Sequence, residues 1–183
     1  CLLLYVGIVI TIRSALRAKG DHLSEDRFSM KALEEDVPRL LSAAPLFAHL
    51  RSEELDVLSQ YSEVLPVAQN DIIFTPGNPG DALFIVSEGE VTIRRRNDAG
   101  EEVDVARFIE GDSFGELDLL RNAERRATAR ATQAGYLVRF PRRNVSFQSV
   151  LEAQPVIHAQ VLYKLLGQIS GRIRNTNKVL SEN

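Results

Sequence analysis

The feature that most constrains the fold is a change in hydrophobic periodicity at Ser62. Before this residue, apolar side chains recur at helical spacing, whereas from there to Phe140 they recur in short runs with a period of two. Short, evenly spaced strands with turn residues between them are typical of an all-β sandwich or barrel. The expected strands are Val64–Val67, Asp71–Thr75, Leu83–Val86, Val91–Arg95, Val103–Phe108, Ala127–Ala131 and Tyr136–Phe140.

Helical patterns lie on both sides of this β-rich region. Before it, apolar side chains line one helical face, and Ser52 is expected to cap a helix that starts with two glutamates. From Asn144 onward the helical period returns, and Pro155 suits the first turn of a helix. The apolar stripe of this last helix comprises Val156, Val161, Leu162, Leu165, Leu166, Ile169 and Ile173.

We therefore expect the α+β fold class: an antiparallel β jelly-roll barrel flanked by N-terminal helices and a long C-terminal helix. The expected segments are an apolar stretch at 1–12, a helical linker and N-terminal helical bundle at 13–61, the barrel at 62–141, and C-terminal helices at 142–183. The terminal helices offer surfaces for a lid or for a homo-oligomer interface.

Composition argues against several function classes. With 22 basic and 25 acidic residues the net charge is −3, so the chain lacks the positive field that favours nonspecific nucleic-acid binding. Too few residues follow the last helix for a DNA-recognition module, and no nucleic-acid partner is expected. His22, His49 and His158 lie outside the expected strands, and the only cysteine is Cys1, so no metal site is predicted. Without a nucleophile or P-loop motif, no enzyme activity is expected.

The first twelve residues, CLLLYVGIVITI, are uncharged and apolar. A spanning helix needs about 20 such residues, so this run alone is too short. Basic residues follow it at Arg13, Arg17 and Lys19, which is the order of a truncated transmembrane helix with its cations on the cytosolic side. A buried element of a globular domain and a mature lipoprotein cysteine are the alternatives. We expect attachment to the cytoplasmic face of a membrane, or otherwise a cytoplasmic location.

The most informative stretch for chemistry is Ser113–Ala131, SFGELDLLRNAERRATARA, where a short helix interrupts the expected strands. Gly115 lets the backbone approach a ligand closely, and the amides that follow belong to a helical first turn that favours an anion. Arg125 lies nine residues after Glu116 and could act as a bidentate phosphate clamp. Glu116 is an acceptor suited to a sugar hydroxyl, so the set predicts a phosphate beside a ribose. A surface ion pair without a ligand is the alternative.

This stretch resembles the phosphate-binding cassette of cyclic nucleotide-binding domains, through Phe114–Leu117 followed by Arg125, Ala127 and Thr128. Such domains occur in the catabolite activator family, kinase regulatory subunits and nucleotide-gated channels. Two earlier segments match the same pattern in order: Ala44–Phe47, and Pro76–Asp81 followed by Leu83–Val86 and Gly89.

The resemblance implies specific roles. Glu116 would accept the ribose 2′-hydroxyl, Arg125 would bind the cyclic phosphate, and backbone amides near the cassette glycine would complete the cradle. The last helix would cap the base through Val161, Leu162 or Leu165, while Gly77, Gly80 and Gly89 would be structural turn glycines. No other cofactor is expected. The predicted ligand-binding residues are Gly115, Glu116, Leu117, Asp118, Arg125, Arg126 and Ala127.

Two cassette positions depart from the family pattern. A small residue is usual where Asp118 stands, and a small or hydroxylated one where Arg126 stands. An aspartate near a bound phosphate would repel it. We hypothesise that Asp118 and Arg126 pair with each other and leave Arg125 free for the ligand. The lack of a hydroxyl at Arg126 favours cyclic AMP over cyclic GMP.

The expected function is a regulatory sensor that binds a cyclic nucleotide and transmits a conformational change to a membrane-attached effector, such as an ion channel or transporter. The alternative is a ligandless jelly-roll module that serves the assembly of a membrane complex.

Overall fold

The computed structural model describes residues 30–97, 99–164 and 166–167. Backbone contacts divide the chain into two units, Cys1–Val37 and Pro38–Asn183. In the first, residues 30–35 are helical. Among the described residues, none of the helices is both long enough and apolar enough to span a membrane. The apolar stretch 1–12 and three stripe residues, Leu165, Ile169 and Ile173, lie outside the described residues.

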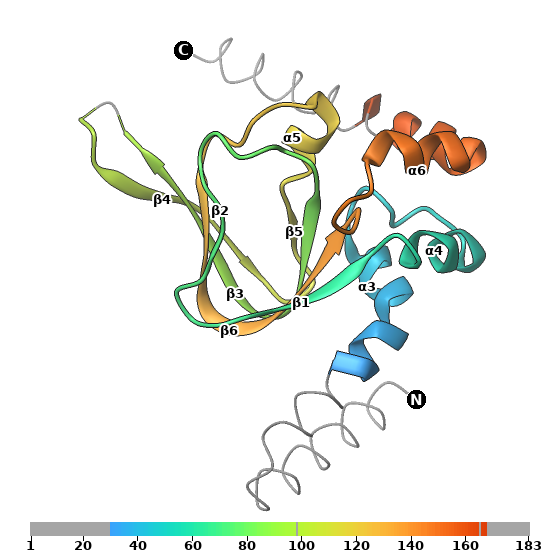
Figure 1. Cartoon of the computed structure of the whole chain (residues 1–183), viewed down its shortest axis with the longest axis horizontal. Helices are drawn as coiled ribbons and strands as arrows, with labels where there is room; N and C mark the ends of the chain where they lie inside the picture. Colours follow the sequence, from blue (N-terminus) through green and yellow to red (C-terminus); the bar gives the residue numbers. More distant parts are fainter. Residues whose placement is uncertain (1–29, 98, 165, 168–183) are drawn as a thin grey trace, which may run out of the picture. The chain divides into compact units, whose positions relative to one another are not determined.

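Short helices and an antiparallel sheet follow one another along the chain (Figure 1). The helices are α3 (Val37–Ala43), α4 (Ser52–Ser59), α5 (Glu116–Arg121) and α6 (Phe147–Ala153), and residues 155–164 are also helical. The strands are β1 (Glu63–Val67), β2 (Ile72–Phe74), β3 (Leu83–Arg96), β4 (Glu102–Ile109), β5 (Ser113–Phe114) and β6 (Thr128–Phe140).

The strands form one antiparallel sheet in the order β1-β6-β3-β4, with β2 paired to β6 and β5 paired to β3. The combination of helices with an antiparallel sheet is the expected class. The expected closure into a barrel is not formed by the described strands, because no pairing joins β1 to β4 and the sheet is left open. Hydrogen bonds of β3 to both β6 and β4 place it in the middle of the sheet.

Strands β3 and β6 are each a single long strand where the alternation of apolar residues predicted two short ones. Leu83–Val86 and Val91–Arg95 were expected as separate strands, yet they are two halves of β3. The residue between them that looked like a turn, Gly89, instead bends the strand with φ +93°. The pairing register with β6 shifts on either side of it, which is the signature of β-bulges. Opposite it, a Cβ on Gly135 would meet the Glu88 carbonyl oxygen, so two backbones approach closely here.

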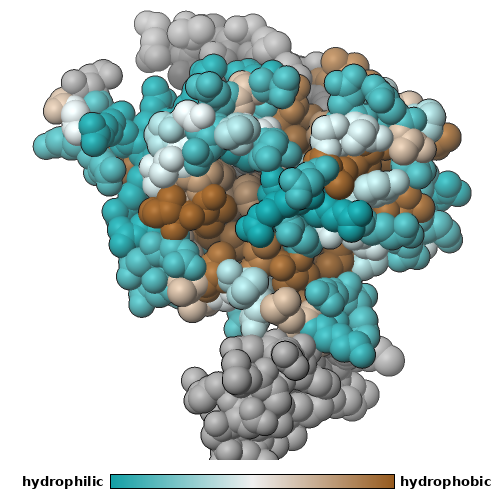
Figure 2. Space-filling model, in the orientation of Figure 1, coloured by the Kyte–Doolittle hydropathy of each residue, from teal (hydrophilic) through white to brown (hydrophobic). Residues whose placement is uncertain are grey.

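The core of the sheet is built around phenylalanine rings. Phe84 stacks on Phe114 with ring centroids 5.3 Å apart, and Phe74 and Phe108 pack against Phe114 at 6.1 and 5.2 Å. Small and branched residues fill the spaces between them, including the fully buried Val91. Apolar side chains also reach the surface: Ile72 of β2 is 52% exposed, and Figure 2 shows hydrophobic surface where the strands cross this face.

The helices pack at one end of the sheet. The fully buried Phe47 makes an edge contact with Phe140 of β6, which in turn contacts Phe147 of α6. The N-cap of α4 is Arg51 rather than the predicted Ser52. The reason is Glu54, whose carboxylate accepts the Arg51 backbone N–H at 2.9 Å and also its guanidinium at 3.0 Å.

Candidate functional site

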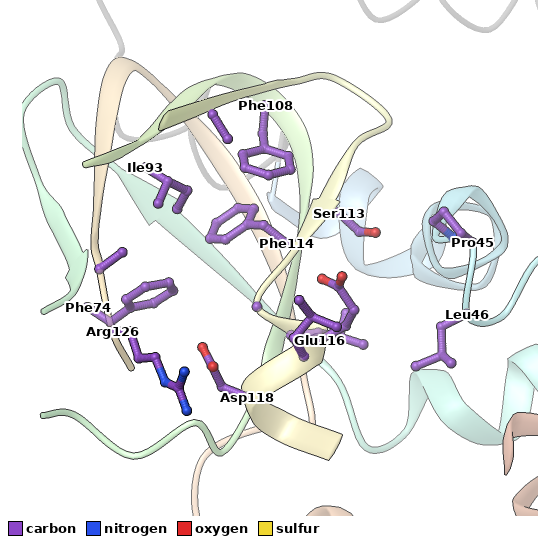
Figure 3. Close-up of a pocket in the computed structure, with 15 residues that line it drawn as sticks. Pro45, Leu46, Phe74, Ile93, Phe108, Ser113, Phe114, Glu116, Asp118 and Arg126 are labelled. Carbon is purple, nitrogen blue, oxygen red and sulfur yellow. The ribbon is translucent and has the colours of Figure 1, made fainter. Parts of the chain in front are cut away.

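A pocket of about 750 Å³ opens between the aromatic core, α5 and the turn that follows α3 (Figure 3). Pro45 and Leu46 of the Ala44–Phe47 motif lie across the pocket from Phe74 and Phe108. The lining residues are Pro45, Leu46, Phe74, Leu83, Ile93, Ala106, Phe108, Ser113, Phe114, Gly115, Glu116, Leu117, Asp118, Arg126 and Ala127.

The pocket has an apolar wall and a charged rim. Aromatic and aliphatic side chains from β2, β3, β4 and β5 form the wall. Glu116, Asp118 and Arg126 are the ionisable residues that line it, so the lining carries two acids and one base. Such a surface accommodates a flat apolar group together with a polar, hydroxyl-bearing one.

Helix α5 begins at Gly115, which has the left-handed φ of +85° that glycine adopts without strain. A Cβ at this position would lie 2.9 Å from Nη1 of Arg125 and 3.2 Å from the Ala82 carbonyl oxygen. The lack of a side chain here therefore makes room for Arg125 beneath the start of the helix.

Arg125 is buried, with 2% of the residue exposed. Its Nη1 donates to the Gly115 carbonyl at 2.9 Å and to Oδ2 of Asp118 at 3.3 Å, and its Nη2 donates to the Ala82 carbonyl. The guanidinium also lies over the Phe74 ring, 4.3 Å from its centroid. Burial lowers the pKa of Arg125, and the hydrogen bond and charge of Asp118 oppose that shift.

One donor of this guanidinium has no partner among the described residues. The Nε atom of Arg125 is buried and makes no hydrogen bond in the part of the chain that the structure describes. A buried N–H without an acceptor is costly, so such a group in a native protein calls for a structural or functional explanation.

The hypothesis that Asp118 pairs with Arg126 is wrong. Asp118 pairs with Arg125, whereas Arg126 is exposed at the pocket rim and makes no hydrogen bond or ion pair with another described residue. The cause is the backbone of the cassette. Arg125 donates its N–H to the Asn78 carbonyl at 2.8 Å and accepts from the Gly77 N–H at 3.0 Å. This extended pairing turns consecutive side chains to opposite sides, one inward and one toward the pocket.

The Pro76–Asp81 segment supports the cassette. Gly80 donates its N–H to the Ala123 carbonyl at 2.9 Å, and Pro79 forms a β-bridge with Glu124. A Cβ on Gly80 would meet that carbonyl at 2.3 Å and the Asp118 Cβ at 2.5 Å. These glycines were expected to shape turns, and Gly80 also lets this loop press against α5.

Six of the seven predicted ligand-binding residues line the pocket: Gly115, Glu116, Leu117, Asp118, Arg126 and Ala127. Arg125 does not line this pocket but a second cavity of about 610 Å³, which Phe74 also lines. Whether they bind a ligand stays a prediction.

Two of the predicted lid residues, Val161 and Leu162, do not line the pocket. Val161 is buried, and Leu162 is exposed to solvent. Leu165, the third predicted lid residue, lies outside the described residues. The lining residues that were not predicted to bind the ligand are Pro45, Leu46, Phe74, Leu83, Ile93, Ala106, Phe108, Ser113 and Phe114.

No group of three or more His, Cys, Asp or Glu side chains suited to a metal ion occurs within residues 30–97, 99–164 and 166–167.

Comparisons with known proteins show what this chain is similar to. Residues 64–153 match the model of the cyclic nucleotide-binding domain. A cAMP-dependent protein kinase regulatory subunit of Mycosarcoma maydis is 36% identical over 112 residues, which cover 61% of this chain and 21% of that protein. The cyclic AMP receptor protein of Thermus thermophilus is 36% identical over 93 residues, covering 51% of this chain and 43% of that protein. The chain thus spans less than half the length of these curated relatives.

The crystal structure of the Thermus thermophilus catabolite activator protein superposes with a TM-score of 0.61 at 30% identity. The match covers 75% of this chain and 62% of that one, so the likeness extends beyond the residues of the family model.

Proposed function

We propose that the pocket beside α5, a helix within the segment 64–153 that matches the cyclic nucleotide-binding domain, binds cyclic AMP in preference to cyclic GMP. The proposal depends on one combination of features. The pocket has an aromatic wall and is also lined by Glu116, and the buried Arg125 guanidinium nearby has an Nε–H without a partner among the described residues. The names of the two curated relatives refer to cyclic AMP, which supports the same nucleotide here.

We assign each part of the ligand to one part of the pocket. The base packs against the aromatic wall that includes Phe74 and Phe108, where burial of its faces from water favours binding. The ribose 2′-hydroxyl donates to Glu116. The cyclic phosphate lies at the cassette, near the first-turn amides of α5 and the edge of Arg125. The preference for adenine depends on the absence of a hydroxyl at Arg126, a group that would favour guanine.

The output is regulatory rather than enzymatic, and it passes through the helices. Pro45 and Leu46 line the pocket and belong to the turn that joins α3 to α4, so a ligand touches the helical region directly. The Gln160 side chain donates to Glu54 of α4 at 2.9 Å, which ties the helix at 155–164 to the same region. We propose that a shift here is transmitted to an effector attached to a membrane through the apolar stretch 1–12.

The proposal is tested by calorimetric titration of the full chain with cyclic AMP, cyclic GMP and 2′-deoxy-cyclic AMP up to millimolar concentration. We expect cyclic AMP to bind about tenfold or more tightly than its 2′-deoxy analogue, because a hydrogen bond to a charged acceptor is worth about 1.5–3 kcal/mol. In Glu116→Ala this difference disappears. Glu124→Ala is the matched control, since this exposed cassette glutamate does not line the pocket.

Two results would contradict the proposal. If the wild-type chain binds none of the nucleotides, the ligandless assembly module is favoured instead. If Glu116→Ala retains the full preference for the 2′-hydroxyl, the ribose lies elsewhere.

A further inference from the structure

We propose that the Asp118 carboxylate is a built-in competitor for the ligand's anion: it occupies the face of Arg125 that the cyclic phosphate needs, and so it sets the affinity of the site. This inference rests on the proposed function, because it concerns the same pocket and the same ligand.

The first step of the argument is the ion pair itself. Oδ2 of Asp118 lies 3.3 Å from Nη1 of Arg125, whose side chain is 1% exposed, while that of Asp118 is 25% exposed. The other hydrogen bonds of this guanidinium among the described residues go to the backbone carbonyls of Gly115 and Ala82, which fix its position without neutralising its charge. The carboxylate is therefore the neighbour that a phosphate would have to replace.

The second step is the charge of the pocket. Glu116 and Asp118 contribute two negative charges to the lining and Arg126 contributes one positive charge. An incoming phosphate thus meets a rim of net negative charge, and like charges at close range repel. Removing the Asp118 charge makes the rim neutral and leaves the Arg125 guanidinium without its paired carboxylate.

The third step is the rigidity of the contact. The Asp118 Cβ would lie only 2.5 Å from a Cβ built on Gly80, so α5 presses directly on the Pro76–Asp81 segment. This packing fixes the base of the Asp118 side chain beside Arg125. A ligand must displace the carboxylate by side-chain rotation or by moving the short helix as a whole.

The proposal predicts an effect that depends on ligand charge. In the 183-residue chain, we expect Asp118→Asn to bind cyclic AMP at least tenfold more tightly than the wild type, and adenosine with a change of less than threefold. Adenosine carries the base and the ribose but no phosphate, so it reports any general change of pocket shape. Asp118→Glu, which keeps the negative charge, is expected to bind cyclic AMP no more tightly than the wild type.

The matched control for long-range charge is Asp104→Asn. Asp104 also pairs with an arginine, Arg94, at 2.7 Å, but neither residue lines the pocket. We expect this variant to bind both ligands as the wild type does. Titrations at two salt concentrations add a second readout, because removal of a charge near the phosphate reduces the salt dependence of binding.

Each outcome decides between the proposals. If the wild type and Asp118→Asn bind cyclic AMP with equal affinity, or the variant binds it more weakly, the inference fails and the proposed function stands. If neither protein binds any nucleotide, both fail. Thermal unfolding provides the readout if Asp118→Asn is unstable: cyclic AMP must raise the Tm of the variant more than that of the wild type.

Discussion

Replacing Arg125 by methionine tests whether this side chain holds the cassette to the sheet. The guanidinium joins the Gly115 carbonyl at the start of α5 to the Ala82 carbonyl beside β3, and methionine removes both bonds while keeping an apolar contact with Phe74. We therefore expect Arg125→Met to lower the free energy of unfolding even with no ligand present.

The magnitude follows from the burial of the partners. Ala82 is fully buried, so its carbonyl oxygen is left without a hydrogen-bond donor, at a cost of about 2–3 kcal/mol. The half-buried Gly115 carbonyl adds about 1 kcal/mol. The partly exposed Asp118 adds less than about 1 kcal/mol. Methionine is uncharged, so the variant no longer carries the desolvation cost of the buried Arg125 guanidinium, which offsets part of this sum. The net loss is about 2–3 kcal/mol, which corresponds to a fall in Tm of about 5–10 °C.

The assay is thermal and denaturant unfolding, followed by circular dichroism, of Arg125→Met beside Arg126→Met. The second variant is the matched control, because Arg126 is exposed and makes no bond to another described residue. We expect Arg126→Met to change the free energy of unfolding by less than about 0.5 kcal/mol. Equal stability of the two variants would refute the structural role of Arg125.

Two further predictions concern α5 and α4. Gly115→Ala should destabilise the fold by about 1–3 kcal/mol more than Gly111→Ala. Both glycines have φ between +85° and +89°, but only a Cβ at Gly115 would meet Arg125. Equal losses of unfolding free energy in denaturation experiments would contradict this. Hydrogen bonds from the side chain and backbone of Arg51 lower the pKa of Glu54 below its ordinary 4.5. The stability that this carboxylate contributes is therefore full above pH 4.5 and lost as pH falls through the lowered pKa. Unfolding of Glu54→Gln, with Glu53→Gln as control, should show a deficit that shrinks in acid; a deficit independent of pH would refute it.

The periodicity of the sequence predicted the class of fold but not the continuity of its strands. Gly89 looks like a turn because glycine separates many strands, and only the partner strand reveals that it bends a single strand instead. Closure of the sheet was likewise not predictable. Alternation indicates that one face is buried, yet the pairing of edge strands such as β1 and β4 depends on curvature set by bulges far away in the sequence.

The site divides in the same way. The cassette was predictable because a local motif places Gly115, Glu116 and Asp118 on one short helix. The directions of Arg125 and Arg126 were not, since they depend on backbone pairing with Asn78, a residue distant in the sequence. Ile93 and Phe108 reach the pocket only through tertiary packing, so no local pattern could single them out.

The contact between Gly80 and α5 has a mechanical consequence. Because Gly80 has no side chain, the loop lies directly against the backbone and Cβ of Asp118, and the hydrogen bond to Ala123 reinforces this contact. An interface of this kind has no soft side chain that could absorb a displacement. A displacement of α5 is therefore expected to move the Pro76–Asp81 loop as well. The loop leads into the long central strand β3, so the start of this strand at Leu83 is expected to move with it.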